Sequence, residues 1–291
     1  MLKVKIIKRI ALIFALAIPV YANAGLRVLD FDYDAHGNKI QDGQIIDNEY
    51  ASWGVTIQSC NFSGSPDAHT SQVNGVCAGH DKTDRQSAFD TLNRYTPDPD
   101  LEFKQKWNGD FVTRQTGDKY DPLSSAEEYY SDLYGAHDPR ADTWKSPGNV
   151  LIINEEKVDC DGRQCEGPND EGARPAGFFV FEFTDAVDIL SLDFFDIEVK
   201  EAQRAGNDAK IFFFLENGEI EERNVPGVGN NNYTRINYEG LFNVTKMVLN
   251  MPGSGAINNL VYKHSQEVSA PSILAIMIIM LGAMVYRKNN T

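Results

Sequence analysis

The chain has 291 residues, of which 27 are Lys or Arg and 42 are Asp or Glu, so its formal net charge at pH 7 is −15. A surface of this charge repels the phosphates of DNA and RNA, which excludes nucleic acid as the partner. The same acidity suits a soluble protein or one that binds divalent cations.

Residues 1–24 have the pattern of a secretory signal peptide. Four basic residues lie within the first nine positions, an apolar run covers 10–20, and Ala22 and Ala24 frame a small-residue cleavage site. We expect cleavage after Ala24, which leaves 23 basic and 42 acidic residues in the mature chain. The alternatives are an uncleaved anchor or a buried helix, but the apolar run is short for a membrane span.

The C-terminus carries a second apolar run, from Ile273 to Tyr286, followed at once by Arg287 and Lys288. The run is near the lower length limit for crossing a bilayer, and basic residues stay on the cytoplasmic side. This predicts a C-terminal transmembrane helix with the body of the protein outside the cytoplasm. A buried core helix is the alternative, but the run lacks the polar face that such a helix would have.

The tail also resembles the PEP-CTERM sorting signals of Gram-negative bacteria. Val268-Ser269-Ala270-Pro271 stands where that family usually has Val-Pro-Glu-Pro, so the motif is a variant form. The resemblance implies that residues 267–291 hold the protein transiently in the inner membrane until an exosortase-like enzyme processes it. It also implies an association with exopolysaccharide production. Because the motif departs from the usual one, a permanent anchor remains the alternative.

The chain has four cysteines, Cys60, Cys77, Cys160 and Cys165, and an even number in an exported protein indicates disulfides. Three pairings are open. The pairing of neighbours, Cys60 with Cys77 and Cys160 with Cys165, requires no assumption about the fold. A zinc site is the alternative, but the spacings are not those of zinc motifs.

The body between the two ends, residues 25–266, reads as an all-β domain. Its apolar runs are short, rich in β-branched and aromatic residues, and separated by turn signals such as Glu216-Asn217-Gly218. The predicted strands are Leu26–Phe31, Trp53–Ile57, Asn149–Ile153, Gly177–Phe183, Val187–Phe195, Lys210–Leu215, Arg235–Tyr238, Lys246–Asn250 and Ala256–Tyr262. Residues 104–146 lack such runs, so we predict a long insertion there, with a capped helix over Ser124–Tyr134.

Several strings in the body resemble exported proteins of the PEP-CTERM type. They are Ala88-Phe89-Asp90-Thr91, Asp98-Pro99-Asp100-Leu101, Gly148–Ile153, Gly177–Phe183 and the closing Gly253–Leu260. The resemblance implies a jelly-roll or galactose-binding-like β-sandwich over residues 26–263, apart from the insertion. Such a fold does not by itself determine the function.

Two groups of carboxylates are candidate calcium ligands. Asp32 and Asp34 alternate at the end of the first strand, before Gly37 and Asn38, and hard cations take oxygen ligands from such loops. No Glu stands where an EF-hand would need one, so a solvated turn is the alternative. The second group is Asp90 with Asp98 and Asp100, where Pro99 restricts the backbone between two carboxylates.

Aromatic residues of the insertion, chiefly Trp107, Tyr120 and Trp144, are candidate sugar contacts. Aromatic faces stack on the apolar faces of sugar rings. The alternative is that these rings pack the insertion against the sandwich.

The hypothesis that follows is an exported, non-catalytic, calcium-stabilised β-sandwich that binds or organises extracellular polysaccharide. The first rival is a secreted glycoside hydrolase that uses carboxylates such as Asp193, Asp196 and Glu198. On a strand, Asp196 and Glu198 would share a face. The second rival is a purely structural surface protein without a defined ligand. No nucleophile motif or zinc-protease motif is present in the sequence.

Overall fold

A computed structural model describes residues 25–62, 73–77, 82–93, 96–98, 101, 103–105, 111–113, 147–154, 158–170, 176–197, 210–227, 233–251 and 253–265. The predicted signal peptide, the predicted sorting signal with its transmembrane helix and the helix predicted over Ser124–Tyr134 lie outside these residues. Within the described residues, no helix is long and apolar enough to cross a membrane.

The regular secondary structure of the described residues is almost entirely strand, which confirms the all-β prediction. Eleven strands form one curled sheet, and β5–β6 and β8–β9 form separate two-stranded sheets. The strands are β1 Leu26–Leu29, β2 Val55–Asn61, β3 Lys82–Thr83, β4 Gln86–Asp90, β5 Phe103–Gln105, β6 Phe111–Thr113, β7 Asn149–Ile153, β8 Asp159–Asp161, β9 Gln164–Glu166, β10 Gly177–Phe195, β11 Lys210–Leu215, β12 Ile220–Asn224, β13 Tyr233–Asn237, β14 Val244–Met251 and β15 Ala256–His264. A 3-10 helix, η1 Ala51–Trp53, precedes β2.

Strand β10 belongs to both layers of the sandwich. Its first half pairs with β14 and β2, and its second half pairs with β15 and β13. Gly177 lies opposite Met251 and Phe195 lies opposite Ala256, and the short turn between Met251 and Ala256 keeps both ends of β10 at the same end of the sandwich. The strand therefore folds over at residues 184–186.

The sequence predicts two strands in this region, and the structure joins them into one. Residues 178–195 contain neither Gly nor Pro, the residues that most often end a strand. The register on β14 shifts between Glu182 and Val187, so the chain bends through an irregularity instead of a turn.

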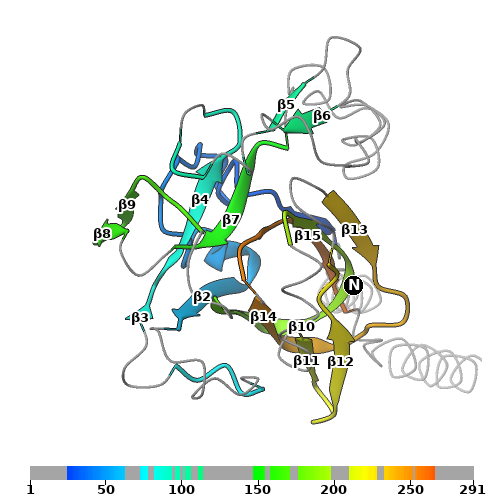
Figure 1. Cartoon of the computed structure of the whole chain (residues 1–291). Coiled ribbons are helices and arrows are strands. Elements are labelled where there is room, and N and C mark those ends of the chain that lie inside the picture. The colour runs from blue at the N-terminus through cyan, green and yellow to red at the C-terminus, as the bar shows by residue number, and fades with distance from the viewer. Residues whose placement is uncertain are drawn as a thin grey trace, which may run out of the picture. The chain divides into compact units, whose positions relative to one another are not determined.

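The two layers follow from the pairing order. One layer runs β12–β11–β14–β10–β2–β3, and the other runs β13–β10–β15 and continues to β1, β7 and β4. Figure 1 shows the sheet curling from β12 through β10 and β15 towards β7 and β4. Strand β15 pairs with β1 near its C-terminal end and with β7 through Ile257 and Leu151.

The main core lies between the layers and is built from alternate residues of the central strands. Phe179 and Phe181 of β10 pack there with Phe213, Leu249 and Leu151. The intervening residues Phe178 and Val180 are also buried, in a second cluster on the outer face of β10. Because both faces are covered over Phe178–Phe181, the sequence of this part of β10 is continuously apolar and not alternating.

A short segment, residues 73–77, covers this outer face and is tied to β2 by the disulfide Cys60–Cys77. Gly75 in this segment has φ of +67°, and a Cβ there would lie 2.8 Å from Val180 and 3.0 Å from Val248. The second disulfide joins Cys160 and Cys165. The neighbour pairing is therefore the one adopted, and it leaves no free cysteine for zinc.

The structure has strands that the sequence did not predict, among them β3 and the buried β4. Strands Asn149–Ile153 and Lys210–Leu215 occur as predicted, whereas β12 was missed because its Ile220-Glu-Glu-Arg-Asn sequence lies at an exposed edge. The short hairpins β5–β6 and β8–β9 were also missed. Hairpin β5–β6 overlaps the start of the predicted insertion, so that region contains strands after all.

Removing the Cys60–Cys77 bond is expected to lower the free energy of unfolding by about 3 kcal/mol, because the bond closes a loop between residues 17 positions apart. The double substitution Cys60→Ala and Cys77→Ala, compared with the wild type by urea unfolding, measures this loss. The matched control, Cys160→Ala with Cys165→Ala, removes a loop of separation 5 and should cost less, about 2 kcal/mol. Equal losses for the two pairs would contradict the prediction.

Candidate functional site

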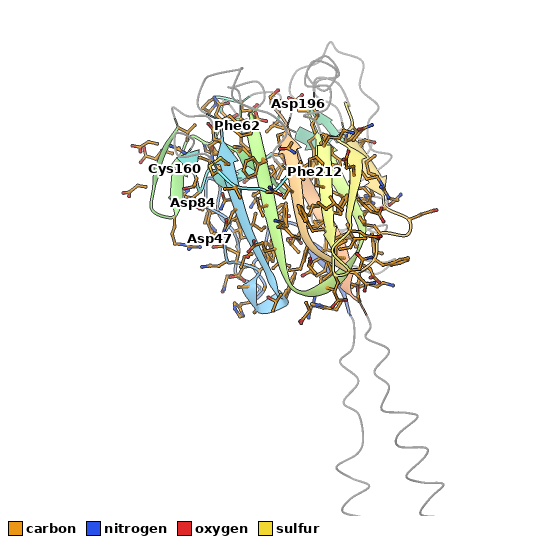
Figure 2. All side chains as sticks on the ribbon, turned by 90° about the horizontal axis from the view of Figure 1, so that it is seen from below. Asp47, Phe62, Asp84, Cys160, Asp196 and Phe212 are labelled. Atoms are coloured by element: carbon orange, nitrogen blue, oxygen red, sulfur yellow. A yellow bond between two sulfur atoms is a disulfide. The ribbon has the colours of Figure 1, made fainter. Side chains whose placement is uncertain are left out.

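Several carboxylates are buried at the end of the sandwich where β10 ends and β15 begins, which we name the loop end. It comprises Asp98, Asp170, Asp196, Ser254 and Gly255. The three aspartates are at most 4% exposed. Figure 2 shows Asp196 at one end of the strands, on the side where β10 finishes. Burial of several charges in one place requires hydrogen-bond donors or a cation nearby.

Hydrogen bonds join the three loops of this end. The backbone N–H of Asp170 donates to Asp98 Oδ2 at 3.2 Å, and the N–H of Gly255 donates to Asp170 Oδ2. A Cβ at Gly255 would lie 2.6 Å from Ile197 Cγ1, and the φ of Gly255 is +136°. Only glycine fits this close approach, so the loop before β15 presses directly against the residues that flank Asp196.

Asp196 lies just beyond β10, not on it. Its φ is +54°, a left-handed conformation that Asp tolerates better than most residues. The prediction that Asp196 and Glu198 share a strand face is therefore wrong, because the strand ends at Phe195. Glu198 itself lies outside the described residues.

The residues that flank the predicted insertion also lie at the loop end. Leu101 packs in a small apolar cluster with Phe195 and Ala256. The carbonyl of Pro147 accepts a hydrogen bond of 3.0 Å from Asn258 Nδ2. Leu101 and Pro147, on either side of the predicted insertion, are therefore both at this end. The candidate sugar contacts Trp107, Tyr120 and Trp144 lie outside the described residues.

Asp193, near the C-terminal end of β10, forms an ion pair with Arg235. Arg235 of the neighbouring strand donates to both of its oxygens, at 2.8 and 3.2 Å, and Asn259 Nδ2 donates to Oδ2 at 2.9 Å. The Asp193 side chain is fully buried, and removing one partner of such a pair costs about 3–5 kcal/mol. Asn259 reaches it because the Asn258–Asn259 bulge in β15 shifts the register on β10.

The first predicted calcium group divides into two structural roles. Asp32 is buried, and its Oδ1 accepts the N–H of Asn149 at 2.9 Å, which anchors the start of β7 to the end of β1. Asp34 is partly exposed, and both its oxygens accept hydrogen bonds inside its own turn, from His36 and Asn38. Both oxygens of Asp34 therefore hold its turn together, and its role as a calcium ligand stays a prediction.

The turn favours the ionised form of the Asp34 carboxyl. Slight desolvation raises the pKa of its carboxyl, but the hydrogen bonds from Asn38 and His36 outweigh it and lower the pKa below the ordinary 3.8. The turn is therefore most stable with Asp34 ionised.

Asp90 is paired with a carboxylate that the sequence does not single out. The N–H of Asp90 donates to Asp42 Oδ1 at 2.9 Å, and Asp90 Oδ1 accepts the N–H of Leu92. Desolvation by burial raises the pKa of Asp42, and the nearby Asp90 carboxylate raises it further, against the lowering effect of the hydrogen bond from Asp90. Asp98, the other member of the predicted group, meets Asp170 at the loop end, and Asp100 is outside the described residues.

Within the part of the chain that the structure describes, no group of three or more His, Cys, Asp or Glu side chains is arranged to hold a metal ion. The calcium hypothesis therefore stays a prediction. Sequence reasoning missed Asp42, Asp170 and Arg235, because each acts on a partner that is distant along the chain.

No protein-family model and no curated protein matches the chain. Among solved structures, it is similar to the recombinant discoidin II of Dictyostelium discoideum, with 11% sequence identity and a TM-score of 0.23. The likeness covers 34% of this chain and 41% of that chain, so it spans less than half of either protein. It assigns neither a family nor a ligand.

The raised pKa of Asp42 predicts a pH-dependent stability. The folded protein binds this proton more tightly than the unfolded chain, so ionising Asp42 makes stability fall as pH rises from 3.8 through its folded pKa. We expect Asp42→Asn, which keeps an oxygen for the N–H of Asp90, to be more stable than the wild type at pH 7. The difference should disappear at acid pH, as measured by urea unfolding at several pH values.

Asp34→Asn is the matched control, because the pKa of Asp34 is shifted in the opposite direction. It should be less stable than the wild type at pH 7, with a difference that shrinks as pH falls through the folded pKa of Asp34. Two variants with the same sign of change at pH 7 would be inconsistent with the assigned environments.

Proposed function

We propose that this protein is an exported, non-catalytic β-sandwich that binds or organises extracellular polysaccharide at the envelope or in the matrix of a Gram-negative bacterium. Its two disulfides indicate an exported protein, because disulfides persist in oxidising compartments. The finer assignment to a galactose-binding-like jelly roll belongs to the same proposal and rests on the resemblance of the body sequence.

The observation that carries the proposal is the position of the residues that border the predicted insertion. Leu26 pairs with Lys263, so the body begins and ends at one end of the sandwich. Leu101 and Pro147 lie at the other end, beside Ala256 and Asn258 at the start of β15. A nine-residue strand spans roughly 25–30 Å. The residues that border the predicted insertion are therefore at the end of the sandwich opposite Leu26 and Lys263.

The buried carboxylates favour a binding module over a hydrolase. A glycosidase needs one carboxyl group that exchanges a proton with the substrate and another that attacks or activates water. Asp193 is held by Arg235 and Asn259 and is fully buried, which suits a structural charge. Asp32 and Asp34 also have structural partners. The hydrolase rival is therefore left with Asp196 and Glu198, whose assumed strand geometry is absent.

Binding to polysaccharide tests the proposal. We expect the mature protein to be retained by exopolysaccharide from an exosortase-bearing Gram-negative bacterium, in a pull-down or on a glycan array. Trp107→Ala or Trp144→Ala should weaken binding about tenfold, the effect of losing roughly 1.4 kcal/mol of ring contact.

Phe242→Ala is the control for this experiment, because Phe242 is an exposed aromatic residue outside the insertion, at 52% exposure. It should leave binding unchanged. Absence of binding to every matrix glycan would favour the purely structural rival. Release of reducing sugar that Asp196→Asn abolishes would favour the hydrolase.

We also propose that calcium stabilises the loop end, with Asp98 as a ligand. The burial of Asp98 beside Asp170 supports this, because a cation offsets the cost of burying carboxylates and calcium prefers oxygen ligands. A ligand that binds only the folded state raises stability by RT ln(1 + [L]/Kd), about 2.7 kcal/mol at a hundredfold excess over Kd.

The expected result is a melting temperature that is higher in millimolar calcium than in chelator. Asp98→Asn should remove the calcium-dependent part, whereas Asp34→Asn should retain it if the loop end is the calcium site, since Asp34 belongs to a separate turn. Identical melting of the wild type in calcium and in chelator would remove calcium from the proposal.

The remaining partners follow from the sequence. We propose that an exosortase-like enzyme processes residues 267–291 after transient retention in the inner membrane. The alternative is a permanent anchor. Intact-mass measurement of the protein recovered from the cell surface distinguishes the two, because processing removes the apolar run.

A further inference from the structure

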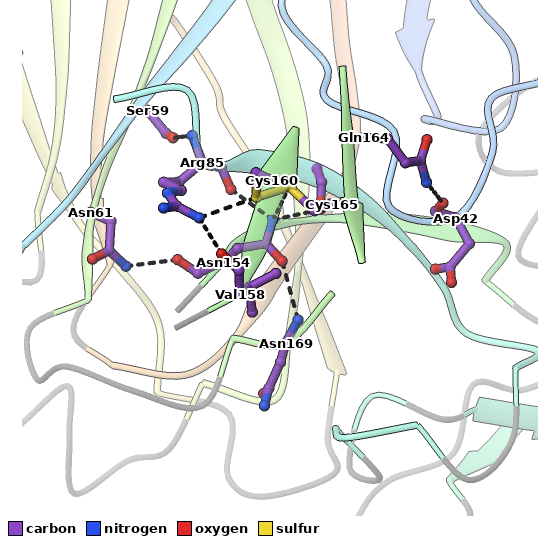
Figure 3. Close-up of a disulfide and its surroundings, with 11 residues drawn as sticks. Asp42, Ser59, Asn61, Arg85, Asn154, Val158, Cys160, Gln164, Cys165 and Asn169 are labelled. Carbon is purple, nitrogen blue, oxygen red and sulfur yellow. Dashed lines mark hydrogen bonds between the residues drawn. A yellow bond between two sulfur atoms is a disulfide. The ribbon is translucent and has the colours of Figure 1, made fainter. Parts of the chain in front are cut away.

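The disulfide Cys160–Cys165 joins the two strands of the β8–β9 hairpin at directly opposed positions. Cys160 is half-buried, whereas Cys165 is 2% exposed. Figure 3 shows this disulfide on the hairpin, with the side chains of Arg85 and Asn154 next to it. Arg85 lies just before β4 in the chain, and Asn154 lies just after β7. This environment differs from that of Cys60, which lies in an apolar cluster.

Each sulfur of this bond receives an N–H group. Arg85 Nη1 lies 3.2 Å from Cys160 Sγ and also donates to the carbonyl of Val158 at 2.6 Å. Asn154 Nδ2 lies 3.5 Å from Cys165 Sγ. A guanidinium next to a cysteine sulfur favours the thiolate, so Cys160 would be the more acidic thiol once the bond is open.

The carboxylates of the hairpin do not oppose this effect from the same side. Side chains alternate between the two faces of a strand. Asp159, Asp161 and Glu166 therefore lie on the face of the hairpin that does not carry the two cysteine side chains. Among the described residues, Arg85 is the charged group that contacts the sulfurs. Arg163, in the turn of the hairpin, is directed to Asp47 and Glu49.

The hairpin is also held in place without the disulfide. The N–H of Cys165 donates to the carbonyl of Gly43 at 2.8 Å, and the carbonyl of Arg163 accepts from Ile45 at 2.9 Å. Asn154, which is fully buried, accepts the N–H of Asn169 at 3.1 Å. After reduction, these bonds would keep the two thiols opposed, which allows the disulfide to form again.

We propose that Cys160–Cys165 is a redox-active disulfide that exchanges with an external dithiol, and that Arg85 stabilises its reduced form. A thiolate of the reductant attacks Cys160 Sγ, the bond to Cys165 breaks, and Cys165 leaves and takes up a proton. The second thiolate of the reductant attacks its own sulfur in the mixed disulfide, and Cys160 leaves as a thiolate beside Arg85. The reductant loses two electrons and two protons. The protein gains both electrons and one proton, and the other proton goes to solvent.

Redox titration of the full chain with mixtures of reduced and oxidised dithiothreitol tests this proposal. Alkylation followed by mass spectrometry measures the two disulfides separately. We expect Cys160–Cys165 to open at a lower ratio of reduced to oxidised dithiothreitol than Cys60–Cys77. Arg85→Gln should raise the ratio needed for Cys160–Cys165 about tenfold, the change that corresponds to one pKa unit of thiolate stabilisation.

Arg163→Gln is the matched control, since it removes a cation from the same hairpin without touching a sulfur, and it should leave the titration unchanged. A purely structural bond predicts that Arg85→Gln behaves like Arg163→Gln, and this result overturns the proposal. Opening of Cys160–Cys165 only at or above the ratio that opens Cys60–Cys77 also overturns it. If Arg85→Gln does not fold, the reactivity of Cys160 in the reduced wild-type protein tests the proposal instead. Its Cys160 should react with neutral iodoacetamide with a pH midpoint below about 8.5, and a midpoint at or above that value also overturns the proposal.

Discussion

Strand β10 is the constraint on which the rest of the structure depends. It pairs with four strands and folds over at residues 184–186, so one segment supplies the centre of both layers. Both halves place apolar side chains in the core between the layers, and the outer face of the first half is also covered, at Phe178 and Val180. The fold-over also returns Phe195 to the end from which Gly177 starts. The loop end, with Asp170, Asp196 and the start of β15, exists because β10 returns there.

Side chains close the sandwich where the backbone ladder does not. Strand β2 pairs with β10 and β3 but has no ladder with β4. The gap is bridged by Ser59 Oγ, which accepts from the N–H of Arg85, by Gln86 Nε2, which donates to Ile57, and by Asn61 Nδ2, which donates to Asn154. Arg85 and Asn154 also contact the sulfurs of the second disulfide. The proposed redox site is therefore attached to the seam between the layers, whose buried amides require these partners.

The acidity of the chain has two physical meanings. Exposed carboxylates give the surface its negative charge, whereas buried and half-buried ones organise backbone N–H groups. Asp32, Asp42 and Asp170 each accept a backbone N–H from a residue distant in sequence. In a chain with 42 acidic residues, local sequence does not separate these two uses. This is why the predicted calcium groups mixed a turn residue, Asp34, with a buried one, Asp98.

The sequence by itself determined the all-β class, the central strands Asn149–Ile153 and Lys210–Leu215, and the net negative charge. These properties are written in composition and short-range hydrophobic pattern. It also allowed the disulfide pairing among three options. The tertiary structure decided which carboxylates are buried and what they bind. Asp193 and Arg235 are 42 residues apart, Asp98 and Asp170 are 72 apart, and Arg85 and Cys160 are 75 apart. Such contacts depend on how β10 bends and where the loops meet, and no local pattern encodes either.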